Sequence, residues 1–362
     1  MPVRAAVLIL ICGIVAAPGE SARAQAKLDP APPLPAGVTP RIERATEKGF
    51  AYLLRTQEAD GSWGATPEQP DYFPVAVTGL VGLAFLAHGD MPTRGVNAPT
   101  VARITDYLIS TSTQNGLFTT GQENAPRNRK GTRPMYGHAF AMTFLAIVYG
   151  QEGDPAKRDK IRVALKKAVD LTRRTQTDDG GWGYRPNYLE DEGTLTVTQL
   201  QSLRTCRDAG ILVPKSVIDK GVRFIERSSN PDGSVRYRIP QNEEYRPGVT
   251  CAAVVALWNA GQYDSDQLRR TQEFMNRYIQ HQWQYGHHAE YVEYYLAQAK
   301  WIVGGNVWSR YYQTASTSFL SLQESDGHWE GPDGDVYGST YATAIALIIL
   351  QLPYDRLPVY QR

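Results

Sequence analysis

The sequence is poor in cysteine, has no excess of either charge, and has no long apolar run beyond its first residues. Of its three cysteines only Cys206 and Cys251 lie past that N-terminal run, which excludes a small fold stapled by disulfides. Cys206 falls late in one expected helix and Cys251 early in another. On neighbouring parallel helices this is an axial offset of roughly 15 Å, beyond the reach of a disulfide, so we predict two free thiols.

The N-terminal apolar run, Ala5–Ala17, is too short to cross a bilayer and has the length of a signal-peptide core. Arg4 precedes it, and Ala22-Arg23-Ala24 offers a cleavage pattern of small residues. We therefore predict a signal peptide over residues 1–24, export to the periplasm or secretion, and no membrane span in the mature chain. An uncleaved anchor is the alternative. Residues 25–40 are predicted to form a stiff, Pro-rich linker.

The charge balance argues against a nucleic acid partner. The chain has 38 Lys and Arg against 37 Asp and Glu, and loss of the signal peptide would remove Arg4, Glu20 and Arg23, leaving 36 of each. Without a basic block there is no electrostatic attraction to nucleic acid or to an anionic membrane. The sequence also lacks a phosphate loop, a dinucleotide fingerprint and a nucleophile elbow, so no cofactor is expected.

What the chain does contain is an internal repeat. The stretch TQEADGSWG (Thr56–Gly64) returns as TQTDDGGWG (Thr175–Gly183) and as LQESDGHWEG (Leu322–Gly331). The first copy joins an amphipathic helical segment, Ile42–Gln57, to a segment that is apolar nearly all round, Val75–Gly89. Altered versions of this unit bring the total to six, spaced by roughly 45–65 residues.

Six helix pairs of this kind cannot bury their apolar faces singly, but they can do so by packing on one another. The apolar helices are then expected inside and the amphipathic helices outside, facing water. The sequence therefore predicts an all-α fold, an α/α toroid (α6/α6 barrel) of about twelve helices that forms one domain over residues 41–362. An open α-solenoid is the alternative. The number of units and the absence of polar capping repeats favour a closed ring.

The stretch KGFAYLLRTQEADGSW resembles the QW motif of squalene cyclases, with matches at Lys48, Gly49, Phe50, Gln57, Gly61 and Trp63. On this motif the chain resembles the prenyltransferase and squalene-cyclase repeat superfamily over nearly its whole mature length. Its ending, ALIILQLPYDRLPVYQR, resembles exported bacterial members. The resemblance implies the fold rather than a chemistry. We interpret the repeated pairs as structural joints between outer and inner helices: Gln57 and Trp63, Gln176 and Trp182, Gln323 and Trp329.

The resemblance also implies where a metal or an acid would lie. Protein prenyltransferases hold zinc through Asp, Cys and His, and the corresponding positions here are Ala252, Val254 and Gly338, so no metal is expected. Class II terpene cyclases use the middle Asp of Asp-x-Asp-Asp-Thr as an acid. The nearest match, Glu190–Thr194, puts Glu192 in that place, where desolvation beside another carboxyl group would raise its pKa. The alternative is an acidic turn that caps a helix.

Aromatic and polar residues gather at the expected starts of the inner helices. In a toroid these starts converge on one mouth, where the side chains could line a single cavity and where helix N-termini favour an anionic group. The His287, His288 and Glu290 cluster has poor spacing for a shared metal. The predicted ligand-binding residues are Tyr72, Tyr136, His138, Arg246, His288, Tyr291, Tyr294 and Tyr337.

These patterns predict an exported toroid whose cavity binds an apolar or isoprenoid-like molecule, such as a lipid, with a polar head. Three alternatives stay open. They are a terpene-cyclase-like isomerase that uses Glu192 as its acid, a glycan-active lyase or hydrolase that uses Tyr and His, and a protein-interaction scaffold. A central carboxyl group of raised pKa would favour the cyclase, an open aromatic groove the glycan enzyme, and a filled pore the scaffold.

Overall fold

The computed structural model describes residues 33–64, 73–121, 133–187, 190–239, 244–283, 286, 288–332 and 334–361. Within these ranges the chain forms twelve α-helices and short 3-10 helices, with isolated β-bridges and no β-strand. The helices belong to one compact unit, Pro35–Arg362. The predicted signal peptide and the first part of the predicted linker lie outside the described residues.

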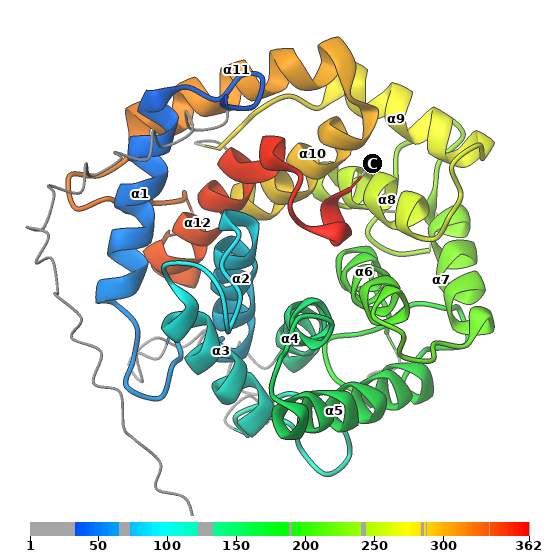
Figure 1. Ribbon diagram of the computed structural model, residues 1–362. Helices are drawn as coiled ribbons and strands as arrows, with labels where there is room; N and C mark the ends of the chain where they lie inside the picture. Colours follow the sequence, from blue (N-terminus) through cyan, green and yellow to red (C-terminus); the bar gives the residue numbers. More distant parts are fainter. Residues whose placement is uncertain are drawn as a thin grey trace, which may run out of the picture. The chain divides into compact units, whose positions relative to one another are not determined.

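The helices alternate between an inner and an outer ring (Figure 1). The outer helices are α1 (Pro40–Arg55), α3 (Ala98–Ser110), α5 (Pro155–Arg174), α7 (Lys215–Ser228), α9 (Asp266–Tyr278) and α11 (Gly305–Leu322). The inner helices are α2 (Pro74–His88), α4 (Pro134–Tyr149), α6 (Gly193–Asp208), α8 (Pro247–Asn259), α10 (Ala289–Val303) and α12 (Gly334–Gln351). Since α12 packs on α2, the inner ring is closed. The predicted toroid is confirmed, and the open solenoid is excluded.

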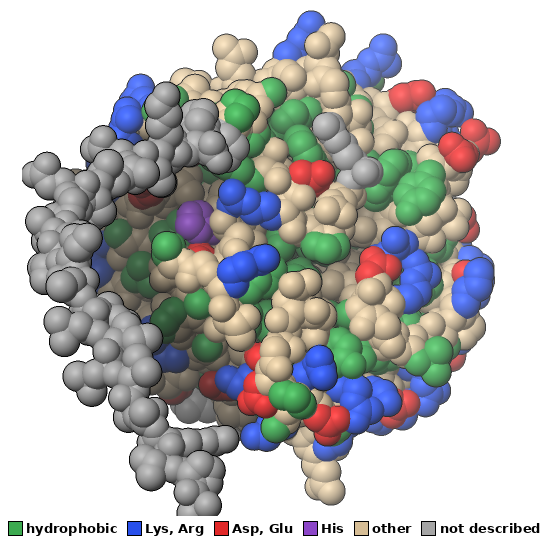
Figure 2. All heavy atoms as spheres, in the orientation of Figure 1, with side chains coloured by type: hydrophobic (Ala, Val, Ile, Leu, Met, Phe, Trp, Pro, Cys, Tyr) green, Lys and Arg blue, Asp and Glu red, His purple; other side chains and the backbone are tan. Residues whose placement is uncertain are grey.

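The division into rings follows from the hydrophobic pattern of each helix. In α2 every residue from Pro74 to Ala87 is buried, as expected of a helix that is apolar all round. In α1 the buried residues, which include Phe50 and Leu53, form one face. The outer helices turn charged side chains of both signs to water, as Figure 2 shows over α5 and α7. Of the described helices, none is both long enough and apolar enough to cross a membrane.

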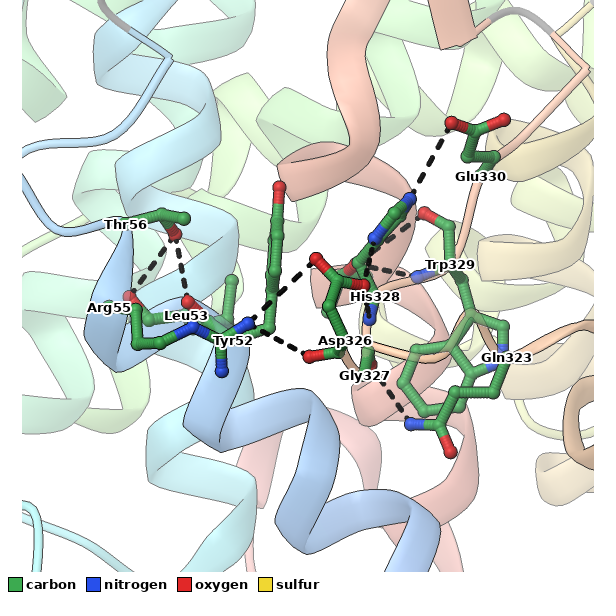
Figure 3. Close-up of polar contacts among 11 residues, drawn as sticks. Tyr52, Leu53, Arg55, Thr56, Gln323, Asp326, Gly327, His328, Trp329 and Glu330 are labelled. Carbon is green, nitrogen blue, oxygen red and sulfur yellow. Dashed lines mark hydrogen bonds and ion pairs between the residues drawn. The ribbon is translucent and has the colours of Figure 1, made fainter.

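The repeated Gln–Trp pairs lie where an outer helix passes into an inner one. At the end of α11, Gln323 donates through Nε2 to the carbonyl of Gly327, at 2.9 Å, within its own turn (Figure 3). The Trp329 indole donates back to the carbonyl of Phe319 in α11, at 2.8 Å, and its backbone N–H donates to Thr343 Oγ1 in α12, at 3.0 Å. Each joint therefore links both of its own helices.

The joints also link neighbouring repeats. Gln176 Nε2 donates to the carbonyl of Val217 in α7, at 2.9 Å, and Arg103 Nε in α3 donates to Gln57 Oε1, also at 2.9 Å. Five joint glycines with positive φ pack against a backbone carbonyl of an adjacent outer helix, so closely that a Cβ would lie only 2.3–2.7 Å from its oxygen. They are Gly61, Gly116, Gly180, Gly233 and Gly327. Glycine is required there both by conformation and by space.

The C-terminal segment, Leu352–Gln361, turns back into the ring (Figure 1). It contains the 3-10 helices η2 (Leu352–Tyr354) and η3 (Pro358–Tyr360), of which η2 packs on α12 and η3 on α6. Its buried side chains are Leu352, Leu357, Val359 and Tyr360. The segment thus occupies space among the inner helices at the end opposite their N-termini, where Tyr360 and Leu357 line a small cleft with Ala87 and Gln351.

Candidate functional site

A cavity of about 570 Å³ lies at the N-terminal ends of the inner helices. Every inner helix contributes to its wall, for example through Val77, Tyr136, Thr194, Val249, Tyr291 and Ile345. The volume falls within the range of roughly 300–1,000 Å³ that is typical of small-molecule sites. The predicted convergence of inner-helix starts is therefore present as a physical cavity.

The structure brings five of the predicted ligand-binding residues into this wall: Tyr136, Arg246, His288, Tyr291 and Tyr294. Tyr72 lies outside the described residues. Tyr337 belongs to α12, but its side chain also lies outside the description. His138 is fully buried and is not among the described residues that line the cavity.

His138 has a structural place instead. Its Nδ1 lies 3.3 Å from the backbone nitrogen of Phe118, whose N–H it accepts, and its Nε2 is 3.0 Å from Thr172 Oγ1. Four other joints use a threonine for the equivalent bond: Thr78, Thr196, Thr250 and Thr343. The sixth uses Glu293, which accepts from the N–H of Gln282 at 2.6 Å. Burial lowers the pKa of His138 to about 3, so the ring is neutral and can accept this bond.

Sequence reasoning missed several wall residues that do carry a signal. Arg133 precedes Pro134 at the start of α4, just as Arg246 precedes Pro247 at the start of α8. Tyr184 and Tyr237 each stand two residues after the joint position occupied by Trp182 or Val235. The Arg-Pro pair and the Tyr spacing could have identified these residues. Gln282, Phe140 and Tyr341 also line the cavity and have no such pattern.

The tyrosines of the wall present their rings rather than free hydroxyl groups. Tyr184 and Tyr237 bond to each other through their hydroxyl groups. The Tyr291 hydroxyl donates to the carbonyl of Thr194 at 3.1 Å, and the Tyr294 hydroxyl is 3.0 Å from that of Tyr360. Burial, followed by repulsion from Glu192, raises the pKa values of Tyr184 and Tyr237, so these groups stay protonated. The wall is therefore aromatic and uncharged at these positions.

The charged groups of the wall are cationic. Arg133 places its guanidinium 4.5 Å from the centre of the Tyr184 ring, and Arg246 is exposed at the rim. His288, which caps α10 in the left-handed conformation with φ 59°, adds an imidazole. None of the described lining residues is Asp or Glu.

Glu192 lies one hydrogen bond behind the wall. It is the N-cap of α6, where its carboxylate accepts from the backbone N–H of Thr194 at 2.7 Å and of Leu195 at 2.8 Å. It also accepts from the Thr194 hydroxyl and from the Tyr136 hydroxyl, the latter at 3.1 Å. Burial raises the pKa of Glu192 above its usual range, and these four bonds to the carboxylate oppose that shift. The residue caps a helix and is linked to the cavity wall through Tyr136 and Thr194.

The described residues contain no group of three or more His, Cys, Asp or Glu side chains placed to hold a metal ion. At the positions of the prenyltransferase zinc ligands, Ala252 and Val254 are buried in α8, and Gly338 sits at a non-helical kink in α12. Cys206 and Cys251 are free, and burial raises the pKa of both thiols. Apolar side chains and a glycine offer no ligand atom for zinc.

The chain belongs to the prenyltransferase alpha-alpha toroid domain family, whose model matches residues 38–219. Among solved structures, the apo type II terpene cyclase MstE from Scytonema is 12% identical, with a TM-score of 0.56, and the match covers 88% of this chain and 99% of that one. A D-mannose isomerase is 13% identical with a TM-score of 0.61, at 88% and 99% coverage. A protein from Actinoplanes is 16% identical with a TM-score of 0.57, at 86% and 99% coverage. At these identities the likeness shows the fold alone. No curated protein matches the sequence.

Proposed function

We propose that the cavity binds an amphiphilic small molecule, with an apolar, isoprenoid-like body inside and an anionic head at the rim. The observation that carries the proposal is the composition of the wall. Its interior is built from aromatic rings and aliphatic side chains, which include Val77, Leu80, Phe140 and Ile345. Because several tyrosine hydroxyls already bond within the protein, a ligand rich in hydroxyl groups would find few partners there, whereas a hydrocarbon body would find a matching surface.

The anionic head follows from the charges at the rim. Arg133 and Arg246 are the two arginines among the described residues that line the cavity. The N-terminus of α6 is already capped by Glu192, so the arginines, rather than that helix end, would hold the head. The Scytonema cyclase, in the same fold, has been solved with geranylgeranyl dihydroxybenzoate, an isoprenoid chain on an acidic ring. A ligand of this chemical class would satisfy both parts of the wall.

Titration of the purified protein with a long-chain carboxylate and with the alcohol of the same length tests the proposal. We expect the carboxylate to bind more tightly, and Arg246→Gln to remove about tenfold of that preference, since a hydrogen bond to a charged group contributes roughly 1.5–3 kcal/mol. Arg223→Gln, an exposed arginine on the outer helix α7, is the matched control and should change nothing. Equal affinity for acid and alcohol, or no binding of either, would contradict the proposal.

Native mass spectrometry of protein purified from its own host provides a second test, in which we expect a co-purifying amphiphile. The proposal also includes export, on the basis of the signal-like N-terminus. N-terminal sequencing of the same material should then begin near Gln25. An intact N-terminus would favour the uncleaved anchor.

A cyclase-like isomerase that uses Glu192 is the second candidate, and the Tyr136–Glu192 hydrogen bond favours it because this bond connects a buried carboxyl group to the cavity. The four hydrogen bonds that Glu192 accepts weigh against it, since they stabilise the carboxylate rather than the acid. Incubation with geranylgeranyl-chain substrates and analysis of the products decides between the two. If the wild type forms a cyclised product and Glu192→Gln does not, the protein is a cyclase that uses Glu192, and the proposal of ligand binding without catalysis is wrong.

A further inference from the structure

The C-terminal segment closes the end of the ring that lies opposite the cavity mouth. Beyond η2, the chain crosses the inner helices and buries Leu357, Val359 and Tyr360 (Figure 1). Two contacts fix it at its outer side: the Tyr354 hydroxyl lies 3.3 Å from Glu43 Oε1, and Arg356 donates to the carbonyl of His88. The C-terminal segment therefore covers the end of the inner ring that lies opposite the cavity mouth.

Tyr360 contacts the cavity-lining residue Tyr294. Its hydroxyl lies 3.0 Å from that of Tyr294, which lines the cavity from α10. The Tyr294 ring in turn packs edge-on against Phe140 from α4, with 6.2 Å between ring centres. Burial raises the pKa values of both hydroxyl groups, so the pair stays uncharged. Tyr294 therefore has Phe140 beside it in the wall and Tyr360 behind it.

The depth of the cavity agrees with this arrangement. On α2 the lining extends to Leu80, six residues beyond Pro74, which is about 9 Å along the helix. On the far side of Tyr360, the cleft that it lines with Ile348 and Gln351 has a volume of only about 10 Å³, room for about one water molecule. The Tyr360 ring thus separates a large cavity at one end of the inner helices from a nearly filled space at the other.

We propose that Tyr360 is a specificity-determining residue: it lies behind Tyr294, which forms the floor of the cavity, and the pair limits the length of the apolar chain that the cavity accepts. This inference rests on the proposed function in that a chain must enter the cavity. It goes further by giving the C-terminal segment a role in ligand selection that is separate from recognition of the head group at the mouth. Chain length, rather than head group, is the property that it controls.

The test measures affinity for two graded series, saturated carboxylates and primary alcohols, in the wild type and in Tyr360→Ala. The alcohols carry no charge, so they report depth independently of the arginines. We expect Tyr360→Ala to accept longer chains, with a gain of about fourfold for each methylene that enters the new space. Tyr360→Phe keeps the ring and should keep the wild-type length profile. Tyr278→Ala removes an exposed tyrosine from the outer helix α9, away from the cavity and from the C-terminal segment, and is the matched control.

Circular dichroism shows whether each variant is folded, and Tyr360→Leu, with a smaller expected shift in the same direction, replaces Tyr360→Ala if the latter is not. An unchanged length profile in these folded variants overturns the inference and leaves the proposed function standing. A shifted profile with equal affinity for acids and alcohols supports the inference and contradicts the anionic head. If neither series binds to the wild type, no chain enters the cavity and both proposals are wrong.

Discussion

Gln323 at the end of α11 donates a 2.7 Å hydrogen bond to the carbonyl of Ala45 in α1, 278 residues earlier in the chain. The same side chain bonds Gly327 in its own turn. One carboxamide therefore shapes the last joint and attaches the last repeat to the first. The contact joins the last repeat to the first, so removing it tests how much ring closure contributes to stability.

Gln323→Ala should lower the free energy of unfolding by about 1–3 kcal/mol, because it leaves partly buried carbonyl groups without their donor. Gln313→Ala, at an exposed position of the same helix, should be neutral within about 0.5 kcal/mol. Urea unfolding followed by circular dichroism measures both. Equal stabilities of the two variants would mean that packing alone closes the ring.

Gly180→Ala and Gly210→Ala separate backbone strain from lack of space. Both glycines have positive φ, 99° and 82°, so either alanine should cost about 1–2 kcal/mol from conformation. At Gly210 no atom lies within 4 Å of the added Cβ, whereas at Gly180 the Cβ would lie 2.3 Å from the carbonyl oxygen of Lys220. Gly180→Ala should therefore be clearly the less stable variant in urea unfolding. Similar losses of unfolding free energy in the two variants would show that the backbone around Gly180 shifts at little cost to make room for the Cβ.

His138→Thr should flatten the pH dependence of stability. The pKa of His138 is about 3 in the folded protein and about 6.5 when unfolded, so its contribution is full above pH 6.5 and is lost as the pH falls toward 3. Between pH 7 and pH 5 the wild type should lose about 2 kcal/mol more than the variant. Threonine supplies the acceptor that four other joints use. Parallel curves of unfolding free energy against pH would contradict the assigned role.

Trp182→Ala should lower the free energy of unfolding by about 3–5 kcal/mol, because the indole is fully buried and its N–H bonds the carbonyl of Thr172 at 2.7 Å. Trp258→Ala, in a half-buried position late in α8, should cost less. Thermal unfolding compares the two, and ligand titration on the folded proteins provides the second readout. If Trp182→Ala has unchanged stability but no longer binds ligand, Trp182 is a ligand-binding residue rather than a structural residue of the joint.

The fold was predictable because periodicity and repetition are local features. An apolar helix such as α2 must be buried on all sides, and six copies of the unit can bury their apolar helices on one another by closing into a ring. The site was predictable only in outline, because convergence follows from the ring but orientation does not. His138 and Tyr136 both fall near the start of α4, two residues apart, yet one side chain bonds the joint and the other lines the cavity. Which of the two faces inward depends on helix rotation, which packing decides.

The role of the C-terminal segment was not predictable from the sequence, because the segment is buried in a space that exists only after the ring has closed. Its apolar residues, such as Leu357 and Val359, are too few and too irregular to indicate a helix or a partner. Arg133 could have been found from its likeness to Arg246, since both precede a proline that begins an inner helix.

The joint glycines have a consequence for how such proteins diversify. At five joints a hydrogen atom in place of a side chain lets adjacent outer helices approach closely, so their spacing is fixed by glycines that do not line the cavity. Residues at the mouth, such as Arg246 and Tyr237, take no part in those contacts. Substitutions there can change which molecule is recognised while the dimensions of the scaffold stay the same, so new specificities can arise one residue at a time.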